Sequence, residues 1–154
     1  MFGAPVRLTG LARGVGTAYL ERKPYGGSWA RMREVAPALG GAWSTNVTPW
    51  RTTSYRVVAG GVTGTASRVL VAVRVGFHEP ANGQLRGVIG PKRAGASVAI
   101  QKRRVDGTWK TLATVSTNAD GEFAANVSLR AGTYRAVARL GGGYVAGYAY
   151  LRVT

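Results

Sequence analysis

Residues 26–47 read GGSWARMREVAPALGGAWSTNV, and residues 106–127 read DGTWKTLATVSTNADGEFAANV. Each stretch places a tryptophan after a glycine-containing turn and a second aromatic residue fourteen positions later. Similar matches keep their order along both halves, as in Ser54-Tyr55-Arg56 against Thr133-Tyr134-Arg135. A match at a nearly constant offset indicates a duplicated unit, here of about seventy-five residues.

Within each unit the apolar residues recur with a period of two. In TYRAVARL, Tyr134, Ala136 and Ala138 fall on one face of an extended strand. Asp106-Gly107 and Asp120-Gly121 supply the backbone conformation of tight hairpins between such strands. Strands that recur every eight to twelve residues, without a helical stripe, are typical of an antiparallel sandwich. We therefore predict an all-β chain of two tandem small antiparallel β-sandwich domains.

The boundaries follow from the repeat. We expect one domain over residues 1–75, a linker over residues 76–83 and a second domain over residues 84–154.

The repeated aromatic residues are interpreted as core residues. Trp29 and Trp109 begin one strand of each unit, whereas Trp43 and Phe123 begin the inward face of the next. Large rings at these places would fill the space between two sheets, each contributing about 2 to 3 kcal/mol on burial. The alternative is that Trp29 and Trp109 are exposed platforms for stacking on sugars.

Residues 87–138, from GVIGPKRAGASVAIQKRR through DGTWKTL and DGEFAANV to GTYRAVA, carry a family resemblance. The order G-x-W, G-x-F, G-x-Y-R resembles that of the immunoglobulin-like, fibronectin-type-III-like β-sandwich repeats of actinobacterial secreted or surface proteins. The resemblance implies an immunoglobulin-like fold, an extracellular or cell-surface location and a non-catalytic spacer, adhesion or binding module within a larger protein. The first domain follows the family pattern more loosely than the second, and the comparison with that pattern implies that its first strand is incomplete. Such motifs specify a fold better than a partner.

The chain is strongly basic, with 21 Lys and Arg against 6 Asp and Glu, a net charge of +15. Ten basic and two acidic residues in 1–75 give +8, and eleven and four in 76–154 give +7, so both halves are basic. Such a charge attracts polyanions: nucleic acid, acidic glycans, wall polymers or anionic membrane surfaces. A compositional bias toward arginine would explain the charge equally well.

Targeting features are not evident in the sequence. The first ten residues, MFGAPVRLTG, lack the pattern of a signal peptide, and no apolar run is long enough for a membrane span. An extracellular location would therefore require a longer precursor. The chain has no cysteine, which excludes disulfides and thiol catalysis.

The sequence offers little for catalysis. His78, the single histidine, precedes Glu79 in the expected linker, where we predict a solvated side chain rather than half of an acid–base or metal pair. Asp106 and Asp120 are expected to cap hairpin turns. We predict no enzyme, no cofactor and no metal site; a hydrolase using scattered carboxylates is the alternative.

The C-terminal stretch YVAGYAYLRVT points to a binding face. If its apolar residues face inward, three tyrosines and an arginine share the outer side, a composition suited to stacking on sugar rings or bases. The alternative is that neighbouring strands half-bury the tyrosines. Basic residues surround this outer side, so we predict that it binds an anionic polymer or cell-wall glycan, or alternatively nucleic acid. We expect the fragment to be a monomer. The candidate ligand-binding residues are Lys102, Arg103, Arg104, Arg135, Arg139, Tyr148, Tyr150 and Arg152.

Overall fold

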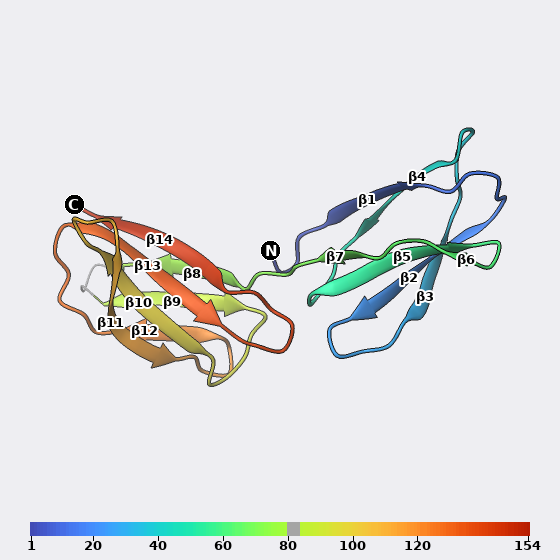
Figure 1. The fold of residues 1–154 in the computed structure, drawn as a ribbon. Coiled ribbons are helices and arrows are strands. Elements are labelled where there is room, and N and C mark those ends of the chain that lie inside the picture. Colours follow the sequence, from blue (N-terminus) through green and yellow to red (C-terminus); the bar gives the residue numbers. More distant parts are fainter. Residues whose placement is uncertain (80–83) are drawn as a thin grey trace. The chain divides into compact units, whose positions relative to one another are not determined.

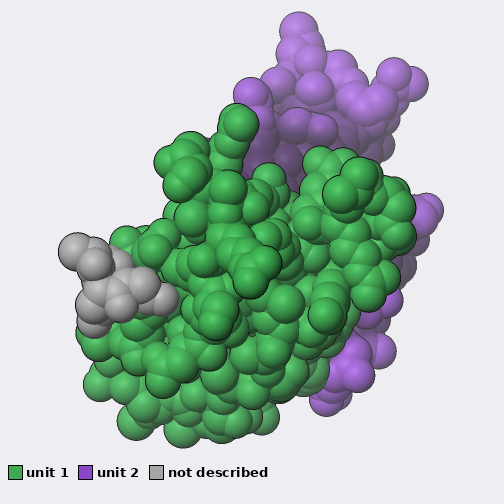
Figure 2. Space-filling view, turned by 90° about the vertical axis from the view of Figure 1, so that its left-hand side faces the viewer, with its two compact units in different colours: residues 1–2, 72–154 green, residues 3–71 purple. Residues whose placement is uncertain are grey.

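The computed structural model describes residues 1–79 and 84–154 as two compact units (Figures 1 and 2). The N-terminal unit comprises residues 3–71, and the C-terminal unit comprises residues 72–154 together with residues 1–2. The described secondary structure consists of strands that pair antiparallel within several sheets, which confirms the predicted all-β fold. None of the described residues forms a helix long and apolar enough to cross a membrane.

The C-terminal unit is a sandwich of a four-stranded sheet, in the order β11-β10-β13-β14, and a three-stranded sheet, in the order β12-β9-β8. Strands from distant parts of the sequence lie side by side in both sheets (Figure 1). The strands are β8 (Arg74–His78), β9 (Leu85–Gly90), β10 (Ser97–Arg103), β11 (Trp109–Ser116), β12 (Glu122–Ala125), β13 (Gly132–Arg139) and β14 (Gly147–Val153).

The core of this unit lies between the two sheets. Phe123 of β12 and Tyr134 of β13 are buried within it, as the alternating pattern predicts. The Tyr134 hydroxyl donates a hydrogen bond to the Arg130 carbonyl oxygen at 2.8 Å and accepts one from the Arg130 amide at 3.0 Å. The Tyr134 ring therefore packs in the core, and its hydroxyl group holds the turn before β13.

The N-terminal unit repeats this arrangement with a two-stranded sheet, β1-β4, and a larger sheet in the order β3-β2-β5-β6, in which β7 also pairs with β5. Its core includes Leu20, Val47 and Tyr55, with the half-buried Trp43 packed against them. The strands are β1 (Val6–Leu11), β2 (Ala18–Pro24), β3 (Ala30–Val35), β4 (Ala42–Val47), β5 (Thr53–Ala59), β6 (Val62–Thr63) and β7 (Ser67–Val69).

Tyr55 is expected to lower the stability of the N-terminal unit at alkaline pH. Burial raises the pKa of Tyr55 above its ordinary value of 10.0, against smaller lowering effects led by the positive charge of Arg22. Because the neutral phenol is favoured in the fold, its contribution to stability is complete below pH 10 and is lost as pH rises through the higher folded-state pKa. Urea unfolding from about pH 9 to about pH 11 should therefore show wild type losing stability faster than Tyr55→Phe. Parallel pH profiles for the two proteins would contradict this prediction.

A β-bulge recurs at the same place in both units and turns one aromatic residue outward. In the C-terminal unit Ile100 pairs with Ala113 but Gln101 pairs with Thr111, so β11 contains one extra residue. The extra residue shifts the alternation, and Trp109 falls on the outer face beside Arg103. The core prediction for Trp109 is therefore wrong.

The N-terminal unit carries the matching irregularity between β2 and β3. There Leu20 pairs with Arg33 but Glu21 pairs with Arg31. Trp29 immediately precedes β3, its ring lies beneath Arg56, and it is absent from the buried cluster of this unit. The core prediction for Trp29 is wrong for the same reason.

The expected linker over residues 76–83 is also corrected in part. Residues 74–78 form β8, which pairs with β9 from Arg74 opposite Gly90 to His78 opposite Arg86. The unit boundary lies between Val71 and Ala72, because Val73 is already buried in the core of the C-terminal unit. The last part of the expected linker, residues 80–83, lies outside the described residues.

Candidate functional site

The outer face of the four-stranded sheet collects polar and aromatic side chains from four strands. Opposite one another in the ladder are Thr111, Gln101, Arg135 and Tyr150, from β11, β10, β13 and β14. Paired residues of neighbouring strands project from the same face, so the register brings these side chains together.

The Arg135 guanidinium occupies the centre of this face. Its carbon Cζ lies 4.1 Å from the ring centre of Trp109 and 5.4 Å from that of Tyr148. Its Nε donates a hydrogen bond to Gln101 Oε1 at 2.7 Å. Tyr150 meets Trp109 at a ring-centre distance of 5.9 Å and an interplanar angle of 55°. We call these five residues, Gln101, Trp109, Arg135, Tyr148 and Tyr150, the aromatic–arginine cluster.

The aromatic–arginine cluster combines accessible rings with a positive charge. Tyr148 is 46% exposed and Tyr150 is 60% exposed, although neighbours within the unit touch both rings. Gln101 orients the Arg135 guanidinium without neutralising it, because an amide carries no charge. Exposed rings beside a guanidinium can stack on a sugar or base while the charge attracts an anionic group.

The structure brings most of the predicted site residues together. Arg135, Tyr148 and Tyr150 belong to the aromatic–arginine cluster, Arg103 pairs with Trp109, and Arg152 is exposed next to Tyr150 on β14, opposite Thr133. These residues share one side of the sheet, as the alternation in YVAGYAYLRVT predicts.

Three predicted residues lie elsewhere. Lys102 points toward the core side, because its ammonium lies 5.3 Å from the Tyr134 ring centre and 3.4 Å from the Arg130 carbonyl oxygen. Arg104 lies in the hairpin turn after β10, with its amide bonded to the Thr108 carbonyl oxygen. Arg139 is exposed on the same face as Arg135 but four residues further along β13, about 13 Å away.

The N-terminal unit contains a related arrangement with a different charge. Arg56 stacks on Trp29 at 4.1 Å, as Arg135 does on Trp109, but its Nε forms an ion pair with Glu21 at 2.8 Å. Glu21 stands where the C-terminal unit has Gln101. The Glu21 carboxylate neutralises the charge of the Arg56 guanidinium, whereas the Gln101 amide leaves the charge of the Arg135 guanidinium in place. The outer face of the C-terminal unit therefore attracts anions more strongly than that of the N-terminal unit.

A basic hollow also lies beside Trp29. It has a volume of about 290 Å³ and combines two cations with two aromatic rings. Sequence reasoning did not single it out, because its residues come from three separate segments. Its lining is Lys23, Pro24, Tyr25, Gly26, Trp29, Thr52, Ser54 and Arg68.

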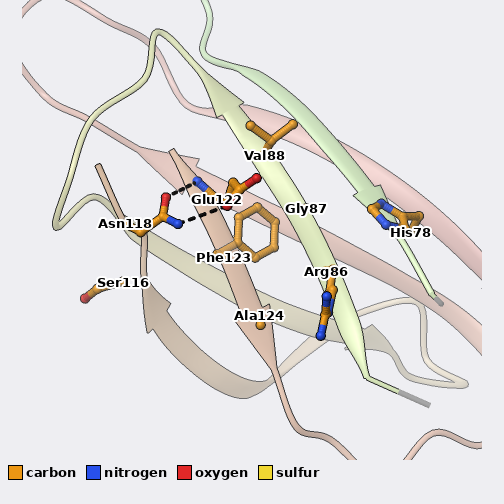
Figure 3. Close-up of a pocket in the computed structure, with 9 residues that line it drawn as sticks. All are labelled: His78, Arg86, Gly87, Val88, Ser116, Asn118, Glu122, Phe123 and Ala124. Atoms are coloured by element: carbon orange, nitrogen blue, oxygen red, sulfur yellow. Dashed lines mark hydrogen bonds between the residues drawn. The ribbon is translucent and has the colours of Figure 1, made fainter. Parts of the chain in front are cut away.

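A larger hollow of about 570 Å³ contains the single histidine (Figure 3). His78 on β8 pairs with Arg86, whereas Glu122 on β12 pairs with Val88, so β9 separates the two titratable side chains. The Glu122 carboxylate instead accepts a hydrogen bond from the Asn118 side-chain amide at 3.0 Å, drawn dashed in Figure 3. This arrangement does not form an acid–base pair.

The two aspartates expected to cap hairpins behave differently. Asp106 Oδ1 accepts hydrogen bonds from the Thr108 hydroxyl at 2.6 Å and from the Thr108 amide at 2.8 Å, and these bonds lower the pKa of Asp106. At the other turn Asn118 caps the backbone, accepting from the amides of Asp120 and Glu122. The side chain of Asp120 instead bonds Lys92 at 3.1 Å, so the capping prediction is wrong for Asp120.

Comparisons with known proteins add little. No family model and no curated protein matches the chain. A solved structure of a tetra-tandem repeat from the extending region of a large adhesion protein has a TM-score of 0.39 and 17% identity, over 99% of this chain and 46% of that chain. The chain thus spans about half the length of that solved repeat segment.

Proposed function

We propose that the chain is a non-catalytic tandem binding module whose C-terminal unit holds an acidic glycan or cell-wall polymer. The observation that carries the proposal is the stacking of Arg135 on Trp109 beside the exposed rings of Tyr148 and Tyr150. Sugar rings present flat apolar faces to aromatic side chains, and their acidic substituents suit a guanidinium.

The electrostatics favour an anionic ligand over a neutral one. The net charge of +15 creates a long-range attraction, and Arg103 and Arg152 flank the aromatic–arginine cluster on the same face. The corresponding face of the N-terminal unit carries the compensated Arg56–Glu21 pair. The C-terminal unit is therefore the main anion-binding unit in this proposal.

Three of the six carboxylates hold structural partners, which supports a binding rather than a catalytic role. Glu21 pairs with Arg56, Asp120 with Lys92, and Glu122 with Asn118. A pair of carboxylates that flanks a scissile bond must be free to accept and donate protons.

The proposal extends to family and location. We propose that both units are immunoglobulin-like and that the chain is a spacer or adhesion module of a larger secreted or surface protein. The bonding of the Tyr134 hydroxyl to the backbone of Arg130, four residues upstream, supports this because immunoglobulin-type sandwiches use such a tyrosine at the start of a strand.

Binding measurements on the full chain test the ligand. Titration with polygalacturonate at physiological salt should give saturable binding that Tyr150→Ala weakens about 5- to 150-fold, since a stacking contact is worth roughly 1 to 3 kcal/mol. Arg139→Gln is the matched control: it removes a charge from β13, but away from the aromatic–arginine cluster, and should weaken binding much less. Equal losses from the two changes would overturn the proposed site.

Nucleic acid is the second candidate, favoured by the same charge and rings. Single-stranded DNA should then bind more tightly than polygalacturonate, with a slope of about 0.7 in log affinity against log salt for each phosphate contacted. If every polymer dissociates at physiological salt and Tyr148→Ala and Tyr150→Ala change nothing, the charge acts only as a non-specific field.

A further inference from the structure

A row of two basic side chains and a hydroxyl crosses the outer face of the larger sheet in the N-terminal unit. Lys23 of β2 pairs with Ser54 of β5, and Ser54 pairs with Arg68 of β7. Paired residues of neighbouring strands project from the same face about 5 Å apart. The two long basic side chains therefore flank the short Ser54 side chain, which leaves a trough between them. We call these three residues the basic row.

The basic row lines the basic hollow of about 290 Å³ beside Trp29. The turn between β2 and β3 forms one wall of the hollow, and the Tyr25 amide holds that turn by donating a hydrogen bond to the Thr52 carbonyl oxygen at 2.9 Å. Arg56 stacks on the Trp29 ring at 4.1 Å and so keeps the ring at the border of the hollow. The wall therefore presents two aromatic rings, Tyr25 and Trp29, next to the cations of the basic row.

The charges of Lys23 and Arg68 are not compensated within the unit. Residues 3–71 contain two carboxylates, Glu21 and Glu34. Glu21 is already bonded to the arginine that stacks on Trp29, and Glu34 pairs with the residue four positions before Lys23 on β2, about 13 Å away. Among the described residues, no ion pair includes Lys23 or Arg68. Two positive charges therefore face one hollow without an anionic partner from the unit.

The same combination of residues recurs at the equivalent place in the C-terminal unit. Arg152 of β14 pairs with Thr133 of β13, and Arg103 falls beside Thr133 because it follows Lys102, the partner of Tyr134. Both units thus place a hydroxyl between two cations, directly before the buried tyrosine of the central strand. Two of the three positions differ in residue but not in chemical character. Such a pattern on an outer face favours a role in binding over one in packing.

We propose that the basic hollow binds a phosphorylated sugar, with the phosphomonoester group between Lys23 and Arg68. A phosphomonoester carries close to two negative charges at neutral pH, which matches two cations, whereas a carboxylate or a sulfate ester carries a single charge. Its oxygens can accept hydrogen bonds from an ammonium, a guanidinium and the Ser54 hydroxyl together. The sugar ring lies against Trp29 and Tyr25, because aromatic rings suit the apolar faces of sugars.

The basic hollow differs from the aromatic–arginine cluster in its place and in its chemistry. The cluster has one guanidinium among the rings of the C-terminal unit, whereas the basic row directs two cations into a hollow of the N-terminal unit. The inference therefore does not rest on the proposed polymer binding. Arg68→Gln should leave polygalacturonate binding nearly unchanged, and Tyr150→Ala should leave sugar phosphate binding nearly unchanged, so failure of one proposal is distinguishable from failure of the other.

Titration of the full chain with glucose-6-phosphate tests the site, with the indole N–H signals of the tryptophans followed by NMR. At constant ionic strength the Trp29 signal should shift saturably. Glucose-6-sulfate has the same ring and one negative charge fewer, so it should bind at least ~5-fold more weakly. Inorganic phosphate lacks the ring and should also bind more weakly than the sugar phosphate.

Single substitutions identify the cations that hold the phosphate. Lys23→Gln and Arg68→Gln should each weaken glucose-6-phosphate binding at least ~5-fold, because each removes one charge-assisted contact. Both side chains are exposed, so the folded structure should persist, and the amide spectrum of each variant verifies this. Arg22→Gln is the matched control: Arg22 neighbours Lys23 on β2 but pairs with the buried Tyr55, so it projects from the opposite face of the sheet. This control removes the same charge and should leave binding nearly unchanged.

Several results would overturn the proposal. Equal losses from the three substitutions would show that only the net charge of the protein matters. Equal binding of the phosphate and sulfate esters would remove the match of two charges to two cations, and equal binding of inorganic phosphate would remove the contact with the rings. No saturable shift of Trp29, or a shift of Trp109 alone, would mean that the basic hollow is not the site.

Discussion

Replacement of Phe123 by alanine is expected to destabilise the C-terminal unit by about 3 to 5 kcal/mol, the usual cost of removing a buried phenylalanine ring. The ring is 4% exposed, stacks on Phe77 and covers Gly87, so its loss leaves a cavity bounded by two strands. Since small domains are stable by roughly 5 to 15 kcal/mol, a large part of the folding free energy should be lost.

Native-state amide hydrogen exchange measures this loss for each unit separately. Protection should fall on β9, β10 and β13, whereas β2 and β5 of the N-terminal unit should keep theirs. Trp43→Ala is the matched change in the N-terminal unit and should cost less, because the Trp43 ring is only half-buried and lines a hollow. A loss below about 1 kcal/mol for Phe123→Ala would show that the ring is not a core element.

The repeat and the alternation of apolar residues were sufficient to predict the all-β fold and much of each core. Phe123, Tyr134 and Trp43 lie on the faces that the sequence pattern assigns to them. These assignments succeed because a strand with one buried face has a strict period of two, and no bulge intervenes at those residues.

The positions of Trp109 and Trp29 could not be predicted in this way. Counting back by twos from Val115 and Ala113, which pack on the core, places Trp109 inside. The extra residue in β11 reverses the alternation before Trp109 is reached. A bulge leaves no local signal in a single sequence, so the outward position of Trp109 beside Arg135 appears only in the structure.

The membership of β8 was missed for a different reason. Its five residues, RVGFH, lie close to a proline and two glycines and read as a connection. What defines the strand is its pairing with β9 and the burial of Val75 and Phe77 against Phe123, contacts with residues far along the chain. Such tertiary contacts override local composition.

The two units thus share one arrangement of paired strands and differ in two features. Gln101 replaces Glu21 beneath the stacked arginine, which leaves the outer face of the C-terminal unit charged. Strand β8 pairs with β9 in the C-terminal unit, whereas the described residues of the N-terminal unit place no strand on the second edge of β1. Both differences can be tested by matched changes in the two units.

The glycine pair Gly87 and Gly10 provides such a test. A Cβ at Gly87 would lie 2.2 Å from the Gly76 carbonyl oxygen on β8 and 2.3 Å from the Phe123 ring. A Cβ at Gly10 would lie 2.7 Å from the Trp43 ring, with no neighbouring backbone among its nearest atoms. Neither glycine has a positive φ, so alanine is compatible with the backbone conformation at both positions.

Gly87→Ala is therefore expected to destabilise the C-terminal unit by about 1 to 3 kcal/mol or more, the range for overpacked cores, because the β8 backbone cannot yield without breaking its ladder. Gly10→Ala should cost clearly less, since the added Cβ meets only the ring of the half-buried Trp43, a side chain that can move. The change from glycine to alanine reduces the entropy of the unfolded chain equally in both variants. The difference between their two losses of stability therefore measures the steric clash alone. Urea unfolding followed by amide exchange measures both losses. Equal costs for the two changes would contradict this prediction, because they would mean that the Trp43 ring yields no more easily than the β8 backbone.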